Sequence, residues 1–305
     1  MKVVQTTNLT KRFGKFIALN DVNLDVNRGE VFGFIGPNGA GKSTTIRTLL
    51  GILKPSDGEV KIFGKDAWRD AVAIHKHLSY VPGDVNLWPN LTGGEVIDLF
   101  MKLRGSNQRN RRDEFIEKFQ LDPSKKCRTY SKGNRQKVAL VAAFASDADL
   151  YILDEPTSGL DPLMEKVFQD CVLEAKVAGK SVLLSSHILS EVEKLCDRVG
   201  IIRQGQMIET GTLQELRHLT RTNLQIETKQ PIDNLGSIKG IYDLEEKGST
   251  FSFQVDSEEL DAVMKYISQF GLLKLESSPP TLEDLFMRHY EDPTELQGIG
   301  EGGQS

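Results

Sequence analysis

The fold is centred on the sequence Gly36-Pro37-Asn38-Gly39-Ala40-Gly41-Lys42-Ser43, which directly follows the apolar run Val31–Ile35. This octet fits the pattern G-x-x-x-x-G-K-[ST], and the apolar run before it predicts a buried strand. The apolar residues after it recur at helical spacing: Ile46, Leu49, Leu50 and Leu53. Glycines let a backbone wrap around phosphates, and the positive end of the new helix attracts anions. The sequence therefore predicts a nucleoside triphosphate site at this strand-to-helix turn.

Each part of this loop has an expected task. The backbone from Gly36 to Thr44 would surround the phosphates, Lys42 would reach the terminal phosphates, and the Ser43 hydroxyl would ligate Mg²⁺. The alternative is a Gly-rich turn that matches by accident, which average glycine usage allows in roughly one chain per hundred of this size. The strand expected before the loop and the helix expected after it weaken that alternative.

Length and composition bound the class of protein. The chain has 305 residues, enough for one large domain and a smaller one. Its net charge is −5 and no basic stripe with aromatics is visible, so no nucleic-acid partner is expected. Three scattered cysteines indicate a reduced compartment with buried thiols. Because no secretory signal and no apolar run of about 18 residues is present, we expect any membrane role to come through a partner.

The order of expected elements predicts an α/β fold. Short strands at residues 3–8 and 22–26 precede the phosphate loop, and we expect them to be antiparallel. Continuous apolar runs at 78–81, 150–153 and 181–185 predict buried strands of a mostly parallel core sheet. Between them, residues of about 86–146 predict a helical insertion, which opens with the capping-box sequence Thr92-Gly93-Gly94-Glu95.

Polar residues follow two of the expected core strands. Asp154 and Glu155 come directly after the run 150–153, and His187 comes after the run 181–185. Two acids at the end of a buried strand are costly unless ions or hydrogen-bond donors meet them. Ligands of open α/β sheets bind at the carboxyl ends of the strands. We therefore expect these side chains at the phosphate site.

Two further helix starts stand out along the chain. Ser131, close to Gly133, is an expected N-cap, and such a helix terminus binds anions. Asp161 is another expected N-cap, with Pro162 at the first helical position. A capped helix is common, so neither start is a specific signal alone.

Two features stay open on the residues alone. Phe13 lies in a segment between two expected strands, where its ring would either stack on a nucleobase or pack into the core. Four arginines crowd the loop that follows the first insertion helix: Arg104, Arg109, Arg111 and Arg112. A solvated loop is the favoured interpretation of this cluster, and contact with anionic lipid headgroups is the alternative.

The pattern changes from about residue 222. The expected order there is β-α-β-β-α-β, which predicts a small α+β domain of ferredoxin-like type. Thr281 would cap a final helix, and the Gly-rich end predicts a disordered tail. We therefore expect a nucleotide-binding domain at 1–219, an accessory domain at 220–290 and a tail at 291–305.

The motifs, in this order, resemble those of the ATP-binding-cassette (ABC) family, specifically the ATPase subunits of bacterial exporters, over residues of about 3–219. The resemblance implies an ATP- and Mg²⁺-dependent ATPase. Phe13 matches the aromatic that stacks on adenine, and Asp154 matches the acid that holds Mg²⁺ through water. Glu155 matches the general base, and His187 matches the histidine that contacts the γ-phosphate.

The same resemblance implies partners. Ser131, Lys132, Gly133 and Asn134 match the family signature, which serves the ATP of a second subunit across a head-to-tail dimer. Asp161 matches the loop that links the two sites. A homodimer is favoured, and it would act on a separate membrane permease at the cytoplasmic face of the cell membrane. Export is favoured over import by this resemblance alone.

The chain also departs from the family pattern. The usual signature is Leu-Ser-Gly-Gly-Gln, and here Lys132 and Asn134 replace a glycine and the glutamine. The glutamine expected after Tyr80-Val81-Pro82, which couples the metal to the membrane subunit, is replaced by Gly83, and Asp84 is its possible substitute. The C-terminal part resembles, weakly, a small domain of some exporter ATPases.

Two other classes of protein are alternatives. One is a soluble ABC-type ATPase that acts on ribosomes, nucleic acid or an assembly machine, although this chain holds one cassette and no sustained heptad run. The other is a P-loop kinase or GTPase, which leaves Ser131, Asp161 and His187 without a role.

Overall fold

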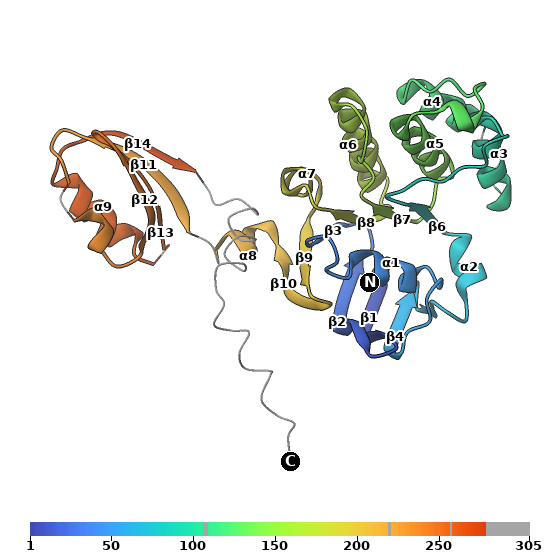
Figure 1. The fold of residues 1–305 in the computed structure, drawn as a ribbon, viewed down its shortest axis with the longest axis horizontal. Helices are drawn as coiled ribbons and strands as arrows, with labels where there is room; N and C mark the ends of the chain where they lie inside the picture. Colours follow the sequence, from blue (N-terminus) through green and yellow to red (C-terminus); the bar gives the residue numbers. More distant parts are fainter. Residues whose placement is uncertain (106–108, 219–220, 233, 257, 279–305) are drawn as a thin grey trace, which may run out of the picture. The chain divides into compact units, whose positions relative to one another are not determined.

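The computed structural model describes residues 1–105, 109–218, 221–232, 234–256 and 258–278 (Figure 1). The contacts divide the chain into two compact units, Met1–Gly211 and a second unit from Thr212 onward. The sequence placed this boundary after residue 219; in the structure, helix α8 (Leu213–His218) belongs to the second unit. No helix in the described ranges has the length and apolar character needed to span a bilayer.

The first unit begins with an antiparallel sheet. Its strands lie in the order β2 (Phe16–Asn27), β1 (Lys2–Phe13), β4 (Asp57–Ile62) and β5 (Lys65–Asp66). Antiparallel N-terminal strands are therefore confirmed, but β1 and β2 are longer than the expected 3–8 and 22–26. They continue as one hairpin to the pair Phe13 and Phe16, because ladder pairing persists where the side chains are exposed and apolar alternation has ended.

The second sheet is the mostly parallel core sheet that the sequence predicted. Its strands, in spatial order, are β10 (Gln206–Thr212), β9 (Arg198–Arg203), β3 (Val31–Ile35), β8 (Ser181–Ser186), β7 (Leu150–Asp154) and β6 (Leu78–Val81). Neighbours from β9 to β6 all pair in parallel. Every residue of β3, β7 and β8 is buried, which explains their continuous apolar runs. The loops after these strands share one edge of the sheet.

Helices cover the parallel sheet, and Figure 1 shows α5 and α6 on the opposite side from β1, β2 and β4. The helices of this unit are α1 (Lys42–Leu49), α2 (Ala71–His75), α3 (Gly93–Leu103), α4 (Arg109–Lys118), α5 (Lys132–Ala145), α6 (Pro162–Val177) and α7 (Leu189–Leu195). A core of apolar side chains from β1, β2, β3, β4 and α1 fills the space between the two sheets. The expected helical insertion is the group α3 to α5, and α3 opens with the predicted capping box of Thr92 and Glu95.

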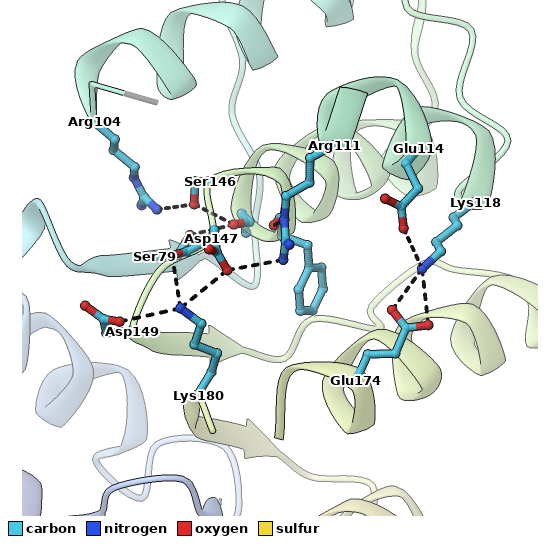
Figure 2. A network of polar contacts seen from close by, with 12 residues as sticks. Ser79, Arg104, Arg111, Glu114, Lys118, Ser146, Asp147, Asp149, Glu174 and Lys180 are labelled. Carbon is cyan, nitrogen blue, oxygen red and sulfur yellow. Dashed lines mark hydrogen bonds and ion pairs between the residues drawn. The ribbon is translucent and has the colours of Figure 1, made fainter. Parts of the chain in front are cut away.

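Polar contacts tie the insertion to the rest of the unit (Figure 2). Lys118 of α4 forms ion pairs with Glu114 at 3.0 Å and with Glu174 of α6 at 2.8 Å. Asp147, just after α5, lies 3.4 Å from both Arg111 of α4 and Lys180, which precedes β8. Under these contacts an aromatic cluster packs between α4, α5, α6 and β7: Phe115, Phe144, Phe168 and Tyr151.

The arginine cluster takes part in these internal contacts. Arg104 donates to the Ser146 hydroxyl at 2.5 Å, and Arg111 donates to the Phe144 carbonyl at 3.1 Å. Arg112 donates to Asp98 at 2.6 Å. Because three of the four guanidinium groups are engaged within the chain, the structure favours neither a fully solvated loop nor a lipid-binding patch.

The second unit holds a four-stranded antiparallel sheet in the order β12 (Ile241–Lys247), β13 (Thr250–Val255), β11 (Thr222–Thr228) and β14 (Leu272–Ser278). Helix α9 (Leu260–Ser268) packs Val263 and Ile267 into its apolar core. The first expected helix is only a 3₁₀ turn, Leu235–Ser237, because Pro231 and left-handed Asn234 (φ 64°) leave too short a segment for an α-helix. The expected Thr281 helix and the tail lie outside the described residues.

Candidate functional site

The phosphate loop joins β3 to α1. Gly41 is the N-cap of α1 at φ 114°, a left-handed conformation that favours glycine. A Cβ at Gly36 would lie 2.3 Å from the Ile202 carbonyl oxygen, so this position also requires glycine. Helix α1 begins at Lys42, so the backbone N–H groups of its first turn lack acceptors within the helix. These N–H groups form a cradle that suits an anion.

Lys42 is the buried cation of the loop, with 5% of its surface exposed. Its ammonium group donates to the carbonyl oxygens of Gly36 at 2.5 Å and Pro37 at 3.1 Å. Burial lowers the pKa of Lys42, and the carboxylates of Glu155 and Asp154 oppose that shift. The two acids that the sequence placed at this site are therefore electrostatic neighbours of Lys42.

Asp154 ends strand β7 and is buried. Its Oδ2 accepts a hydrogen bond from the Ser43 hydroxyl at 3.2 Å, and its Oδ1 accepts one from the Ser185 hydroxyl of β8 at 2.6 Å. These two donors meet the buried carboxylate, as the cost of burying an acid requires. The contact brings the phosphate loop and the end of β7 together.

Glu155 follows Asp154 in a strained conformation. Its φ is 47°, a left-handed value that is costly for a residue with a side chain, at about 1–3 kcal/mol. The backbone N–H of Glu155 donates to the Ser185 carbonyl at 2.9 Å, which fixes this turn. The Glu155 Oε1 lies 3.4 Å from Nδ1 of His187, and their side chains are 29% and 56% exposed. An acid and a histidine thus meet at the open sheet edge.

The α5 terminus lies against the loop that follows Glu155. Ser131 caps α5 by accepting from the Asn134 N–H at 3.3 Å, and Lys132 donates to the Ser158 hydroxyl at 2.7 Å. A Cβ on Gly133 would lie 2.4 Å from the Gly159 carbonyl oxygen, so glycine permits this close approach. Asp161 caps α6, as expected, by accepting from the Met164 N–H at 3.0 Å.

Other predicted site residues lie outside the acid cluster. Phe13, at the end of the β1–β2 hairpin, is 48% exposed, and the Lys11 ammonium lies 5.1 Å from its ring centre. Its ring is therefore not packed into the core. Gly83 follows β6 and faces the acids: a Cβ there would lie 3.1 Å from the Asp154 carbonyl oxygen. Asp84, its possible substitute, is exposed.

The structure adds residues that the sequence did not indicate. The Ser185 hydroxyl donates a hydrogen bond to the Asp154 carboxylate, whereas the sequence indicates only that Ser185 ends a buried strand. Gln136 of α5 is buried and donates to the Pro156 carbonyl at 2.9 Å. Glu191 of α7 is 5% exposed and lies beneath the His187 turn. A buried polar residue is visible only once the packing is known.

Two families match separate parts of the chain. Residues 19–158 match the family described as ABC transporter. Residues 211–290 match the C-terminal domain of the ATP-binding proteins described as DrrA1-3-like.

Curated and solved relatives cover more of the chain. The bacitracin transport ATP-binding protein BcrA of Bacillus licheniformis is 31% identical over 94% of this chain and 96% of its own length. A solved ATP-binding subunit of an ABC transporter is 33% identical, with a TM-score of 0.68 over 71% of this chain and 92% of that one.

A second solved structure adds a nucleotide state. The ATP-binding cassette MJ0796, solved as a dimer bound to ADP and Pi after hydrolysis, is 25% identical with a TM-score of 0.64, over 69% of this chain and 98% of that one. The phosphate loop, the acid pair and these likenesses agree. The chain belongs to the ATP-binding subunits of ABC transporters and is an ATP hydrolase of that family.

Proposed function

We propose that the chain is the ATP-hydrolysing subunit of an exporter, working as a dimer on a separate membrane permease. One observation carries the catalytic part: the Ser43–Asp154 and Glu155–His187 contacts meet at one sheet edge beside the phosphate loop. The relative named for bacitracin transport supports a role in transport, and the motifs that resemble those of exporter ATPases support export as its direction.

ATP would bind through the phosphate loop. The N–H groups at the start of α1 and the Lys42 ammonium would hold the phosphates, and Phe13, with its exposed ring, would stack on adenine. The oxygens of Ser43 and Asp154, 3.2 Å apart, fit Mg²⁺, which prefers oxygen ligands and keeps several waters. When bound, this ion would neutralise charge on the phosphates.

Glu155 is the proposed general base. Its partly exposed carboxylate would take a proton from the attacking water as the new O–P bond forms and the bond to ADP breaks. His187, whose Nδ1 lies 3.4 Å from this carboxylate, would contact the γ-phosphate. The strained turn at Glu155 would hold the base at a fixed position relative to that phosphate.

A second copy of the chain would complete the site. The α5 terminus, with Ser131, Lys132, Gly133 and Asn134, faces the loop of Ser158 in its own chain. Its anion-binding end would meet the ATP of the partner chain, and Asp161 would lie between the two sites. ATP would then hold the dimer together, and hydrolysis would release it.

The permease would contact the insertion. Trp88 and Phe100 form an exposed pair with ring centres 6.1 Å apart, and Leu103 of α3 is 72% exposed. Exposed apolar groups of this kind mark protein interaction sites. The loop of Gly83 and Asp84 leads into this pair, so a permease bound there would sense the acid pair through backbone contact at Gly83. The chain would lie at the cytoplasmic face of the cell membrane.

The hydrolysis step is tested with Glu155→Gln. This variant should bind Mg²⁺-ATP with unchanged affinity and hydrolyse it about 10²–10⁴-fold more slowly, because general-base catalysis has that magnitude. Phosphate release measures the rate, and equilibrium titration measures the affinity. Wild-type turnover in this variant would remove Glu155 from its proposed role.

The partner is tested by affinity purification of the full chain from detergent-solubilised native membranes, with mass spectrometry of the bound proteins. A stoichiometric multi-spanning protein that raises the ATPase rate is the expected result. Recovery only in the soluble fraction, with ribosomal or assembly proteins, would contradict the transporter role while leaving the ATPase activity unchanged.

A Trp88→Ala variant should no longer bind the permease in this purification, and it should keep its own ATPase rate.

A further inference from the structure

A buried carboxyl group without a role in the proposed hydrolysis step lies between the loops of Glu155 and His187. It belongs to Glu191, in the first turn of α7, which is 5% exposed. Its Oε2 accepts from the Ser186 hydroxyl at 3.0 Å and lies 3.5 Å from the Thr157 hydroxyl. Its Oε1 is buried and has no hydrogen-bond partner among the residues that the structure describes. An acid buried in this way is costly and needs a reason.

The first loop held by Glu191 is the His187 turn. The Ser186 hydroxyl donates to Glu191 and accepts from the Ile188 N–H at 3.0 Å. The Glu191 N–H in turn donates to the Ile188 carbonyl at 3.2 Å. These bonds fix the residues on both sides of His187, whose own side chain is exposed. The position of the imidazole therefore depends on the Glu191 carboxyl.

The second loop follows Glu155. Thr157 is buried and reaches Glu191 from two residues beyond Glu155. On its other side this loop is held by Gln136, which donates to the Pro156 carbonyl at 2.9 Å. The loop after Glu155 is therefore hydrogen-bonded to two helices, to α7 through Glu191 and to α5 through Gln136.

The two loops set the distance between the reacting groups. Glu155 and His187 lie just beyond the last pair of β7 and β8, Asp154 with Ser185, so their 3.4 Å contact also depends on the turns that follow these strands. From these contacts we infer that Glu191 is a positioning residue, which ties the loop after Glu155 to the His187 turn and keeps both groups aligned for ATP cleavage. This inference rests on the proposed roles of Glu155 and His187.

The chemistry of the Glu191 carboxyl group indicates which substitutions should keep its hydrogen bonds and which should remove them. Burial raises the pKa of Glu191, although the hydrogen bonds from Ser186 and Thr157 work against that shift. A neutral carboxyl group is close in shape to an amide, so glutamine keeps the acceptor that Ser186 needs. Alanine removes the acceptor and leaves the Ser186 hydroxyl without it.

The test compares steady-state ATPase kinetics of full-length variants. Glu191→Ala should lower kcat about 10–100-fold, since a small misplacement of catalytic groups has effects of that order. Its KM and its equilibrium affinity for ATP should change by less than about twofold, because the phosphate loop is untouched. Glu191→Gln should restore most of kcat. The matched control is Val192→Ala, the next residue of α7, which is fully buried and should lower the melting temperature while keeping kcat.

Several results would overturn the inference. Equal losses of kcat in Glu191→Ala and Val192→Ala would mean that Glu191 contributes only to packing. A Glu191→Gln variant as slow as Glu191→Ala would exclude the role of Glu191 as a hydrogen-bond acceptor. Where Glu191→Ala does not fold, Ser186→Ala carries the test, and wild-type kcat in that variant would contradict us. These results are distinct from a failure of the proposed function, in which Glu155→Gln would hydrolyse ATP at the wild-type rate.

Discussion

Lys42 is held in its loop by two carbonyl oxygens, those of Gly36 and Pro37. A terminal phosphate would offer the same ammonium group a charged acceptor, and charge-assisted hydrogen bonds are about twice as strong as neutral ones. We expect Lys42→Ala to weaken ATP binding at least about tenfold in an equilibrium titration. Lys166→Ala, on an exposed i,i+4 ion pair of α6, should leave the affinity unchanged. Equal affinity of Lys42→Ala and wild type would contradict the role of Lys42.

Glu191 should also make stability depend on pH. Its pKa in the folded protein is raised by burial, so the folded state keeps a proton that the unfolded state releases above pH 4.5. The free energy of unfolding should therefore fall, relative to Glu191→Gln, as the pH rises from 4.5 through the folded pKa, and level off above it. Urea unfolding of both proteins between pH 4.5 and 8 measures this difference. A difference that does not change with pH would contradict a buried, ionisable Glu191.

Single residues also show the reach of sequence analysis. The sequence predicts Lys42, Asp154, Glu155 and His187 at one edge because each follows a strand with a clear apolar run, and the carboxyl ends of parallel strands share an edge. Their roles stay predictions until variants are measured. Ser185 gave no such signal, since a serine at the end of a buried strand is indistinguishable from an ordinary strand residue until its contact with Asp154 is seen.

At the scale of elements, the capping box of α3 gives a direct stability prediction. The Thr92 hydroxyl accepts from the Glu95 N–H at 3.1 Å, and Glu95 accepts from the Thr92 N–H at 2.6 Å. Thr92→Ala removes the cap and should lower the free energy of unfolding by about 0.5–2 kcal/mol. Thr92→Ser keeps the hydroxyl and is the control. Equal stability of the alanine and serine variants in urea unfolding would contradict the capping role.

Elements were predictable where local signals were strong. The core strands and α3 follow from apolar runs and a capping box. The hairpin of β1 and β2 was predicted too short, because its distal half is exposed and pairing there depends on the partner strand. A helix near Leu235 was predicted from the alternation of strands and helices, but the structure has only a 3₁₀ turn there. Pro231 and left-handed Asn234 leave too short a segment for an α-helix.

At the scale of the whole molecule, the two groups of residues predicted to bind ATP lie at different places in the chain's fold. The phosphate loop and the acid pair share one sheet edge, whereas the start of α5, the proposed second anion site, contacts the Ser158 loop. This division is understandable if a second chain supplies the missing half. The sequence indicated it only through the family resemblance, because a helix N-terminus alone does not specify a ligand.

Two chains should associate when they bind ATP, and light scattering of Glu155→Gln measures this association. With Mg²⁺-ATP, this slowly hydrolysing variant should have twice the mass of the 34.0 kDa chain, and with ADP it should have the mass of one chain. Ser131→Ala should weaken the ATP-dependent dimer, since the cap of α5 is lost. A single-chain mass for Glu155→Gln at saturating Mg²⁺-ATP would contradict the account.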